Sequence, residues 1–361
     1  METDFYKNKT VLVTGAAGSI GKEIVRQLIR LDVKVVRALD INETGLFYLD
    51  QIVNTDRLRV FIGDVRDYKR LKLALENVDI VFHAGALKHV PLCEYNPFEA
   101  INTNILGTQN LIQAALTNNV KKFINISTDK AINPTNVMGA TKLLAERLTI
   151  AANLYVGFKE ISFSTVRFGN VLGSRGSVIP LFFNQIRKGE PVTVTDPKMT
   201  RFVMKIEEAV KLVLNTATFA KGGEIFILEM PAIYLGDFVE AMIEEVAPLF
   251  NHDPNSIKIK TIGSRIGEKR YEELLSDYET QTSDIYKKDK IFILVPNNPY
   301  YHPVLVKNLA KFYNEFGEKL QPENNVGLFS SAKASILTKD QIKPLIHEVV
   351  QNLIDSQLEF E

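Results

Sequence analysis

Residues 10–21 read Thr-Val-Leu-Val-Thr-Gly-Ala-Ala-Gly-Ser-Ile-Gly, and this stretch decides the fold. Its apolar first half predicts a buried strand, and residues 19–31 predict a helix that follows directly. The glycines between them, three residues apart, allow backbone to approach a pyrophosphate at the positive end of that helix. A strand before and a helix after are the context that makes such a motif informative. The residues expected to bind a dinucleotide here are Gly15, Ala17, Gly18, Ser19, Ile20 and Gly21.

The next predicted strand, residues 33–39, ends in Asp40. This acid lies 19 residues beyond Gly21, close to the roughly 20 at which an acid meets the adenosine ribose. A carboxylate there accepts from a free 2′-hydroxyl and repels a 2′-phosphate, and no arginine follows it. We therefore expect NAD rather than NADP, with a surface aspartate that only caps the next helix as the alternative.

Short apolar runs recur at residues 59–62, 79–83 and 122–126, and helical patterns lie between them. This alternation predicts an α/β fold with a Rossmann-type, doubly wound parallel sheet. The pattern loosens after Gly169. We predict an NAD-binding domain at residues 1–170, with contributions from about residues 200–230. A smaller C-terminal α/β substrate-binding region, residues 171–361, would be interleaved with it.

Residues 127–142 follow the 122–126 strand, at the edge where open α/β sheets bind their ligands. An acid and a lysine lie at the strand tip, and a second lysine lies within the next helix, four residues after a methionine on the same face. This arrangement suits proton transfer beside a cofactor, although most such loops are only solvated connections. The candidate catalytic residues are Thr128, Asp129, Lys130, Met138 and Lys142.

The loop after the 79–83 strand contains candidate contacts to the cofactor and to the substrate. Ala84, Gly85 and Ala86 follow the 79–83 strand and are small enough for backbone to pass close to a cofactor. Lys88 and His89 come next and are candidates for substrate contact, whereas His83 is expected to be a satisfied strand-end residue. Asn104, inside the following helix, is expected to bond neighbouring backbone.

Basic, glycine-containing turns mark the second half of the chain, and we expect them to bind the phosphates of a nucleotide-sugar. Their candidate residues are Asn170, Arg175, Arg201 and Arg265. The alternative is that Arg175 and Arg201 form surface ion pairs, each worth little.

Composition excludes several other classes of protein. The 361 residues include 43 Lys plus Arg and 43 Asp plus Glu, so no overall field attracts nucleic acid or an anionic membrane. The single cysteine, Cys93, excludes an intrachain disulfide and fits a reducing cytosol. The polar N-terminus is no signal peptide, and no run approaches the roughly 20 apolar residues of a membrane span. We expect a cytoplasmic protein without a membrane span or a metal site.

The order of these motifs resembles the extended short-chain dehydrogenase/reductases, and within them the UDP-N-acetylglucosamine 4,6-dehydratases of polysaccharide and flagellin-sugar biosynthesis. The resemblance spans roughly residues 10–345. Asp129-Lys130 is its most specific element, because many other sugar-nucleotide dehydratases have Asp-Glu there. The matching stretches are residues 14–21, 82–91, 127–131, 138–142, 167–171, 174–180, 199–202 and 267–269.

The resemblance implies an NAD-dependent lyase that turns UDP-N-acetylglucosamine into a 4-keto-6-deoxy sugar by internal hydride transfer. It implies that Lys130 is the base at carbon 5, Asp129 the acid for the carbon 6 hydroxyl, Thr128 a partner of the carbon 4 oxygen, and Lys142 a partner of the nicotinamide ribose. It places Asp64 and Val65 beside the adenine. It adds Ser174, Val178 and Glu268 to the substrate contacts.

Three departures from the family pattern matter. Met138 stands where most of the superfamily has a tyrosine that takes the carbon 4 hydroxyl proton, although some dehydratases also carry methionine. Gly85 replaces a more usual alanine. We expect the chain to lack the membrane region of the longer relatives and to resemble the short soluble form, whose relatives are homo-oligomers, commonly dimers or hexamers. A UDP-sugar 4-epimerase and a non-catalytic NAD-binding relative remain the alternatives.

Overall fold

The computed structural model describes residues 3–174, 176–297, 309–314, 317–320 and 329–358. The chain divides into two compact units. Unit 1 consists of Met1–Phe168, Glu207–Glu229 and Leu274–Asn325, and unit 2 consists of Gly169–Ile206, Met230–Glu273 and Val326–Glu361. Each unit is described by itself.

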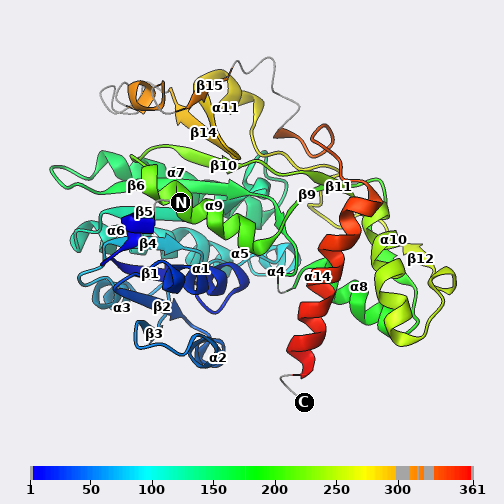
Figure 1. The fold of residues 1–361 in the computed structure, drawn as a ribbon. Helices are drawn as coiled ribbons and strands as arrows, with labels where there is room; N and C mark the ends of the chain where they lie inside the picture. The colour runs from blue at the N-terminus through cyan, green and yellow to red at the C-terminus, as the bar shows by residue number, and fades with distance from the viewer. Residues whose placement is uncertain (1–2, 175, 298–308, 315–316, 321–328, 359–361) are drawn as a thin grey trace. The chain divides into compact units, whose positions relative to one another are not determined.

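A ten-stranded sheet forms the centre of unit 1, in the order β15-β13-β14-β10-β6-β5-β4-β1-β2-β3 (Figure 1). The strands from β3 to β10 in this order are parallel, and β14, β13 and β15 extend the sheet beyond β10, each antiparallel to the strand before it. The predicted doubly wound parallel fold is therefore confirmed, with an antiparallel extension at one edge. The strands are β1 (Thr10–Thr14), β2 (Val35–Asp40), β3 (Leu58–Ile62), β4 (Ile80–His83), β5 (Lys122–Thr128), β6 (Ser162–Phe168), β10 (Ile225–Leu228), β13 (Ser283–Lys288), β14 (Ile291–Pro296) and β15 (Glu318–Lys319).

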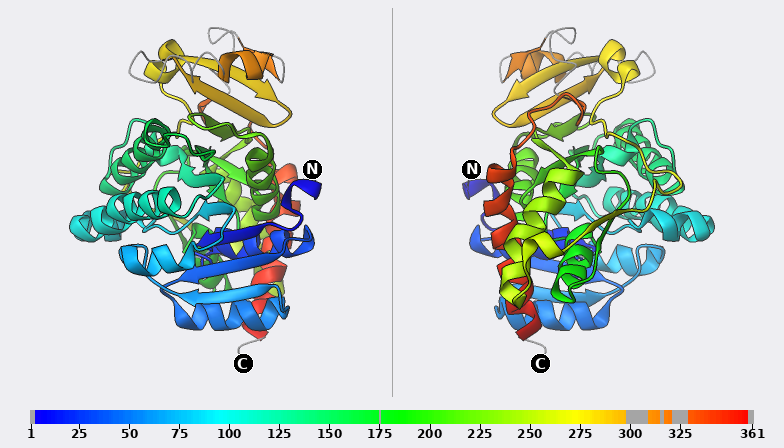
Figure 2. Two further views of the ribbon diagram at one scale, coloured as in Figure 1. Left: turned by 90° about the vertical axis from the view of Figure 1, so that its left-hand side faces the viewer. Right: turned by 90° about the vertical axis from the view of Figure 1, so that its right-hand side faces the viewer.

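Helices cover both faces of this sheet, with α1 and α9 on one face and α3, α6 and α7 on the other (Figure 2). Every residue of β1, β4, β6 and β10 is buried, as expected for strands covered on both sides. The α-helices of unit 1 include α1 (Ser19–Arg30), α2 (Glu43–Val53), α3 (Tyr68–Ala74), α4 (Val90–Tyr95), α5 (Pro97–Ala100), α6 (Gly107–Thr117), α7 (Val137–Ala151), α9 (Ile206–Phe219, whose first residue belongs to unit 2) and α11 (Asp277–Thr282). Shorter helical segments are η1 (Thr3–Tyr6), η2 (Ile101–Leu106), η3 (Asp129–Ala131) and η4 (Ala152–Leu154).

Unit 2 has a smaller core of its own. Strand β9 pairs parallel with β7 and antiparallel with β11, and β8 pairs parallel with β12. Its core is made of side chains such as Phe182, Phe238 and Ile346, from three helices. The elements are β7 (Asn170–Val171), α8 (Val178–Arg187), β8 (Val192–Val194), β9 (Thr200–Met204), β11 (Ala232–Tyr234), α10 (Leu235–Val246), η5 (Ala247–Phe250), η6 (Pro254–Ser256), β12 (Ile259–Thr261) and α14 (Lys339–Leu358).

Each unit is made of three segments of the chain, so the two units are not separated by one boundary near residue 170. Helix α9 and strand β10, within the 200–230 segment, belong almost wholly to unit 1. Leu274–Asn325 also belongs to unit 1, because β14 pairs antiparallel with β10 and extends the large sheet. The assignment of a cofactor to one unit and of substrate binding to the other remains a prediction.

Candidate active site

Three backbone segments lie close together at the glycine loop between β1 and α1: residues 15–16, Gly21 and residues 84–85. Gly15 has φ +67°, and a Cβ on it would lie 2.6 Å from the Gly85 nitrogen. A Cβ on Gly21 would lie 2.1 Å from the Gly15 oxygen. Helix α1 begins after Gly18, which has no side chain to cap it, so its first turn carries the positive dipole end without a side-chain acceptor at the cap. The loop therefore has the backbone cradle that a pyrophosphate requires.

Asp40 is tied to this loop. Its Oδ2 accepts a hydrogen bond from the Ala17 N–H at 3.0 Å, and its Oδ1 accepts one from the Asn42 N–H at 2.9 Å. The cap of α2 is Asn42, whose Oδ1 accepts from the Gly45 N–H. Asp40 is therefore not the helix cap, and its carboxylate lies beside the backbone of the glycine loop.

Asp64 and Val65 follow β3, next along the sheet. Asp64 accepts from the backbone and side chain of Arg66, and these hydrogen bonds hold the pKa of its carboxyl below the usual range. Val65 is buried, and a Cβ on Gly107 would lie 2.7 Å from its Cγ2. At the end of β3, Asp64 is therefore held by Arg66, and the apolar side chain of Val65 packs against Gly107.

His83 at the end of β4 is a satisfied residue, as predicted. The Thr108 hydroxyl donates to the Asn104 carbonyl, so His83 Nε2–H must donate to Thr108 Oγ1 at 3.0 Å. His83 Nδ1 then accepts from the Thr14 hydroxyl at 2.7 Å. Burial, with a smaller contribution from the Lys142 charge, lowers the pKa of His83 to about 3, which keeps the ring neutral.

The loop after β4 has two parts. Residues 84–86 are partly buried beside the glycine loop, where the Ala84 N–H donates to the Thr14 carbonyl. Lys88 and His89 are exposed. Asn104 fixes the loop between them, because its Oδ1 accepts from the Leu87 N–H and its Nδ2 donates to the Leu87 carbonyl. The expectation that Asn104 bonds neighbouring backbone is thus wrong: the partner lies 17 residues earlier, and Thr141 of α7 is a third contact.

Thr128, Asp129 and Lys130 are brought together at the tip of β5 and in η3. Asp129 is fully buried. Its Oδ1 accepts from the Thr128 hydroxyl at 2.8 Å and from Lys130 Nζ at 3.0 Å. Its Oδ2 is also buried, yet it has no hydrogen-bond partner among the residues that the structure describes. A buried carboxylate oxygen without a partner is costly unless it is protonated or meets a ligand.

Lys142 and Met138 of α7 have different neighbours: Lys142 bonds a backbone carbonyl of β5, and Met138 packs among apolar side chains. Lys142 Nζ donates to the Ile126 carbonyl of β5 at 2.6 Å. Burial lowers the pKa of Lys142 to about 8, and the charge of Glu146 opposes that decrease. Met138 is buried in a small cluster with Cys93 and Ala100, so its thioether lies among apolar neighbours. The helix starts close to η3, since a Cβ on Gly139 would lie 2.3 Å from the Lys130 oxygen.

An ionic cluster under this site was not found from the sequence. Arg167 of β6 is completely buried and donates to the carboxylates of Glu146 in α7 and Glu279 in α11. Arg167 stands next to Ser127 in the pairing of β6 with β5. Its place in a strand, rather than in the glycine-rich turn that follows, was the only available signal, and its partners lie too far away in sequence to predict.

The predicted substrate contacts of the second half of the chain all fall in unit 2. Asn170, Val178 and Arg265 are exposed, and Ser174 and Glu268 are partly buried. Arg175 lies outside the described residues. The backbone N–H of Arg265 donates to Glu268 Oε2.

Arg201 is not a surface ion pair, because only 9% of it is exposed. Its Nη2 donates to Glu268 Oε1 at 3.3 Å, to the Lys269 carbonyl at 2.9 Å and to the Met199 sulfur. Its Nη1 donates to the Thr200 carbonyl. Arg201 thus holds β9 to the 268–270 loop within unit 2.

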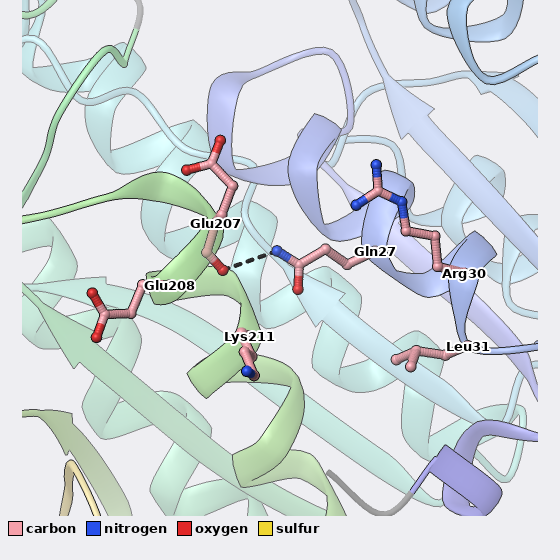
Figure 3. A pocket seen from close by; sticks show the side chains of 6 residues that line it. All are labelled: Gln27, Arg30, Leu31, Glu207, Glu208 and Lys211. Carbon is pink, nitrogen blue, oxygen red and sulfur yellow. Dashed lines mark hydrogen bonds between the residues drawn. The ribbon is translucent and has the colours of Figure 1, made fainter. Parts of the chain in front are cut away.

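A separate hollow of about 510 Å³ lies between α1 and α9 in unit 1 (Figure 3). Gln27 Nε2 donates to the Glu207 carbonyl across it. Its lining mixes acids and bases and includes none of the predicted site residues, so it is not part of the candidate active site. The lining residues are Gln27, Arg30, Leu31, Glu207, Glu208 and Lys211.

Three curated proteins show what the chain is similar to. An uncharacterized membrane protein of Methanocaldococcus jannaschii is 54% identical over 96% of this chain and 98% of its own. The inverting UDP-N-acetylglucosamine 4,6-dehydratase of Campylobacter jejuni is 41% identical over 90% of this chain and 93% of its own. A UDP-glucose 4-epimerase of Rickettsia rickettsii is 41% identical over 77% of this chain and 81% of its own. In the described part of this chain, no helix is long and apolar enough to cross a membrane.

Solved structures share the fold. Pen from Bacillus thuringiensis has a TM-score of 0.84 and 42% identity, over 95% of this chain and 98% of that chain. MoeE5 in complex with UDP-glucose and NAD has a TM-score of 0.60 and 27% identity, over 72% of this chain and 87% of that chain.

The fold and these likenesses define a short-chain dehydrogenase/reductase of the class that converts nucleotide-sugars with an NAD-type cofactor. The resemblance to the UDP-N-acetylglucosamine 4,6-dehydratases is thereby confirmed. Within the class, the chain belongs to the family described as polysaccharide biosynthesis protein, whose model matches residues 11–295.

Proposed function

We propose that the protein is a UDP-N-acetylglucosamine 4,6-dehydratase that makes a UDP-2-acetamido-2,6-dideoxy-4-hexulose. The observation that carries this proposal is the buried Asp129, with one carboxylate oxygen bonded to Thr128 and Lys130 and the other without a partner among the described residues. A dehydratase needs an acid and a base that reach one carbon–carbon bond of the sugar, and Asp129 and Lys130 would supply them. The similarity to the Campylobacter jejuni dehydratase supports the choice of substrate.

NAD fits the cradle in unit 1, because a Cβ on Gly15 or on Gly21 would meet backbone at 2.6 or 2.1 Å and Asp40 is fixed beside this loop. When bound, NAD would accept a hydride from carbon 4 of the sugar and return it to carbon 6. Asp40 would receive the 2′-hydroxyl of the adenosine ribose, and its charge favours NAD over NADP. Val65, with residues 84–86, would border the cofactor, and Lys142 would donate to the nicotinamide ribose.

The proton transfers would be divided between two neighbouring residues. Lys130 would remove the proton on carbon 5. Asp129 would give a proton from Oδ2 to the departing carbon 6 hydroxyl, because Oδ1 is already occupied by Thr128 and Lys130. Thr128 would bond the carbon 4 oxygen. Met138 has no proton to exchange, so the carbon 4 hydroxyl proton would pass to Asp129, to Lys130 or to a water held by Thr128.

The substrate's other contacts are proposed from the predicted residues. Lys88 and His89 would meet the sugar, and residues of unit 2, with Arg201 and Arg265 foremost, would bind the diphosphate. Asn170, Ser174, Arg175, Val178 and Glu268 would contribute to that site. We also propose a homo-oligomer, on the ground of family resemblance.

One incubation distinguishes the proposed function from its rivals. Purified protein is mixed with UDP-N-acetylglucosamine, and the nucleotide-sugar is analysed by mass spectrometry and by absorbance in alkali. Loss of one water with a new 4-keto absorbance is the expected result. An epimer of unchanged mass, from this sugar or from UDP-glucose, would identify a 4-epimerase, which the Rickettsia rickettsii relative makes the second candidate. Bound NAD without any conversion of either sugar would identify a non-catalytic relative.

A further inference from the structure

We propose that Glu146, held by Arg167 and Glu279, is a positioning residue that keeps Lys142 charged and aimed at the cofactor. The inference rests on the proposed role of Lys142 at the nicotinamide ribose. It adds a group that touches neither cofactor nor sugar and acts only through Lys142.

The cluster is built around one guanidinium whose five N–H groups are all used. Arg167 Nε and Nη2 donate to the two oxygens of Glu146 at 3.1 and 2.6 Å. Its Nη1 and Nη2 donate to the two oxygens of Glu279 at 3.2 and 3.0 Å. The remaining N–H donates to the Leu274 carbonyl at 2.8 Å. Such paired forks fix both position and orientation, which a lysine could not do.

The second carboxylate is anchored from outside the pair. Glu279 accepts from the N–H and the hydroxyl of Ser276, which form a capping box at the start of α11. Arg147 lies 3.7 Å from it. Helix α11 therefore holds Glu279, Glu279 holds Arg167, and Arg167 holds Glu146.

Glu146 acts on Lys142 by its charge, because the two residues are one helical turn apart on α7. Lys142 is buried and reaches across to the Ile126 carbonyl of β5. Burial favours the neutral amine, and the charge of Glu146 favours the ammonium. Arg167 forks onto Glu146 and supplies the opposite charge that a buried carboxylate requires.

The other groups around Lys142 do not supply a compensating charge. His83 of β4 is neutral at physiological pH because burial lowers its pKa to about 3. Asp129 and Lys130 of η3 lie 3.0 Å apart and together have no net charge, whichever of the two holds their shared proton. Arg167 of β6 is neutralised by two carboxylates. Among the described charged groups near the amine, Glu146 is therefore the one that favours its charged form.

The test measures NAD affinity by calorimetry from about pH 6 to about pH 10. If the ammonium of Lys142 donates to the ribose, wild-type affinity falls as the pH rises through about 8. In Glu146→Gln the fall begins about one pH unit lower, because the opposite charge that raises the pKa of Lys142 is gone. Lys142→Arg, which stays charged throughout, removes the fall and assigns it to residue 142.

Glu279→Gln is the matched control, since it breaks an equivalent fork of the same arginine without removing the charge beside Lys142. It should lower stability and leave the pH of the fall unchanged. An unshifted fall in Glu146→Gln, or an equal shift in Glu279→Gln, overturns the inference. If Glu146→Gln does not fold, replacing Glu146, Arg167 and Glu279 together by methionine removes all three charges of the cluster, leaves Lys142 without its carboxylate and should show the same shift.

The readout requires no sugar turnover. A protein that binds NAD with this pH dependence but does not dehydrate UDP-N-acetylglucosamine would contradict the proposed function and support the inference. A dehydratase whose NAD affinity does not fall with rising pH would do the reverse.

Discussion

At the scale of single residues, the two oxygens of Asp129 have different surroundings. Oδ1 accepts from Thr128 and Lys130, whereas Oδ2 is buried with no described partner. A carboxyl with one oxygen held and one available can present a proton in a fixed direction. Lys130 Nζ donates to the held oxygen, Oδ1, at 3.0 Å and therefore lies beside the acid.

Replacing Lys130 by alanine should lower dehydratase turnover by about 100- to 10,000-fold, the usual effect of losing a general base. NAD binding should persist, because the amine is not part of the proposed cofactor contacts. Lys130→Arg is the control, since it keeps a cation beside Asp129 but is a poor base at neutral pH. Turnover and exchange of the carbon 5 proton with deuterated solvent are measured. Full activity in Lys130→Arg would show that the residue only pairs with Asp129.

Replacing Asp40 by asparagine should reduce the preference for NAD over NADP. The change removes the charge that repels a 2′-phosphate, while one side-chain oxygen still accepts from the backbone near the glycine loop. The ratio of the two dissociation constants, from calorimetry, is the measurement. Glu43→Gln removes a nearby exposed charge and should leave the ratio unchanged. Tighter binding of NADP than NAD by the wild type would contradict the role of Asp40.

His83 should make the protein less stable in mild acid. Its pKa is about 3 when folded and about 6.5 when unfolded. The unfolded chain therefore binds the proton first, so this stability is complete above about pH 6.5 and is lost as the pH falls toward 3. Between pH 7 and pH 5 the loss should be about 2 kcal/mol. Urea unfolding at both pH values should show a smaller loss in His83→Gln, whereas His347→Gln, at an exposed histidine, should match the wild type.

At the scale of helices and strands, local signals in the sequence were sufficient for the central sheet and not for its extension. Strand β1 (Thr10–Thr14) lies in the apolar first half of residues 10–21, where a buried strand was predicted, because an apolar run before a glycine loop is typical of a parallel sheet. Strands β13 and β14 were not predicted, and they bring a late segment into unit 1 by antiparallel pairing. Sequence pattern gives the period of a strand, but it does not identify its neighbour.

The same limit applies to the site. The residues at the tip of β5 follow from their position after a buried strand, so their proximity was predictable. Arg167 and Glu279 are 112 residues apart, and Asn104 bonds a loop 17 residues earlier. These contacts depend on how the helices pack onto the sheet, which no short motif encodes. The buried position of Met138 likewise depends on Cys93 of α4 and Ala100 of α5.

Gly139→Ala tests whether the fit of α7 against η3 positions the catalytic pair. The added Cβ would lie 2.3 Å from the Lys130 oxygen, so either the helix or η3 must shift. A displacement of about 1 Å costs on the order of 100-fold in rate, although no catalytic side chain is altered. Turnover and thermal unfolding are compared with Ala140→Ser, which adds one atom at the exposed neighbouring position. Unchanged turnover in Gly139→Ala would mean that η3 tolerates the shift.

At the scale of the whole molecule, the exposed surface of unit 1 has an apolar region along α4, α5 and η2. Tyr95 is 86% exposed and Phe98 is 79% exposed, with Leu92 and Leu106 also exposed nearby in sequence. Apolar side chains gathered in this way usually mark an interface. The expected homo-oligomer, which the family resemblance implies, would bury this region against a second copy of the chain.

Light scattering after gel filtration should therefore give a mass that is a multiple of the 40.7 kDa protomer. Tyr95→Glu combined with Phe98→Glu should shift the protein toward the protomer, because each copy would have to bury two carboxylates in an apolar contact. Phe47→Glu is the matched control, since Phe47 is also an exposed aromatic residue but lies on α2. Dissociation by Phe47→Glu alone would place the interface on α2, and a wild-type protein that elutes as a protomer would contradict assembly altogether.

Because Tyr95 and Phe98 precede the η2 segment that carries Asn104, the turnover of the dissociated double variant should also be measured. A protomer that retains full turnover would show that the site in unit 1 does not depend on the second copy.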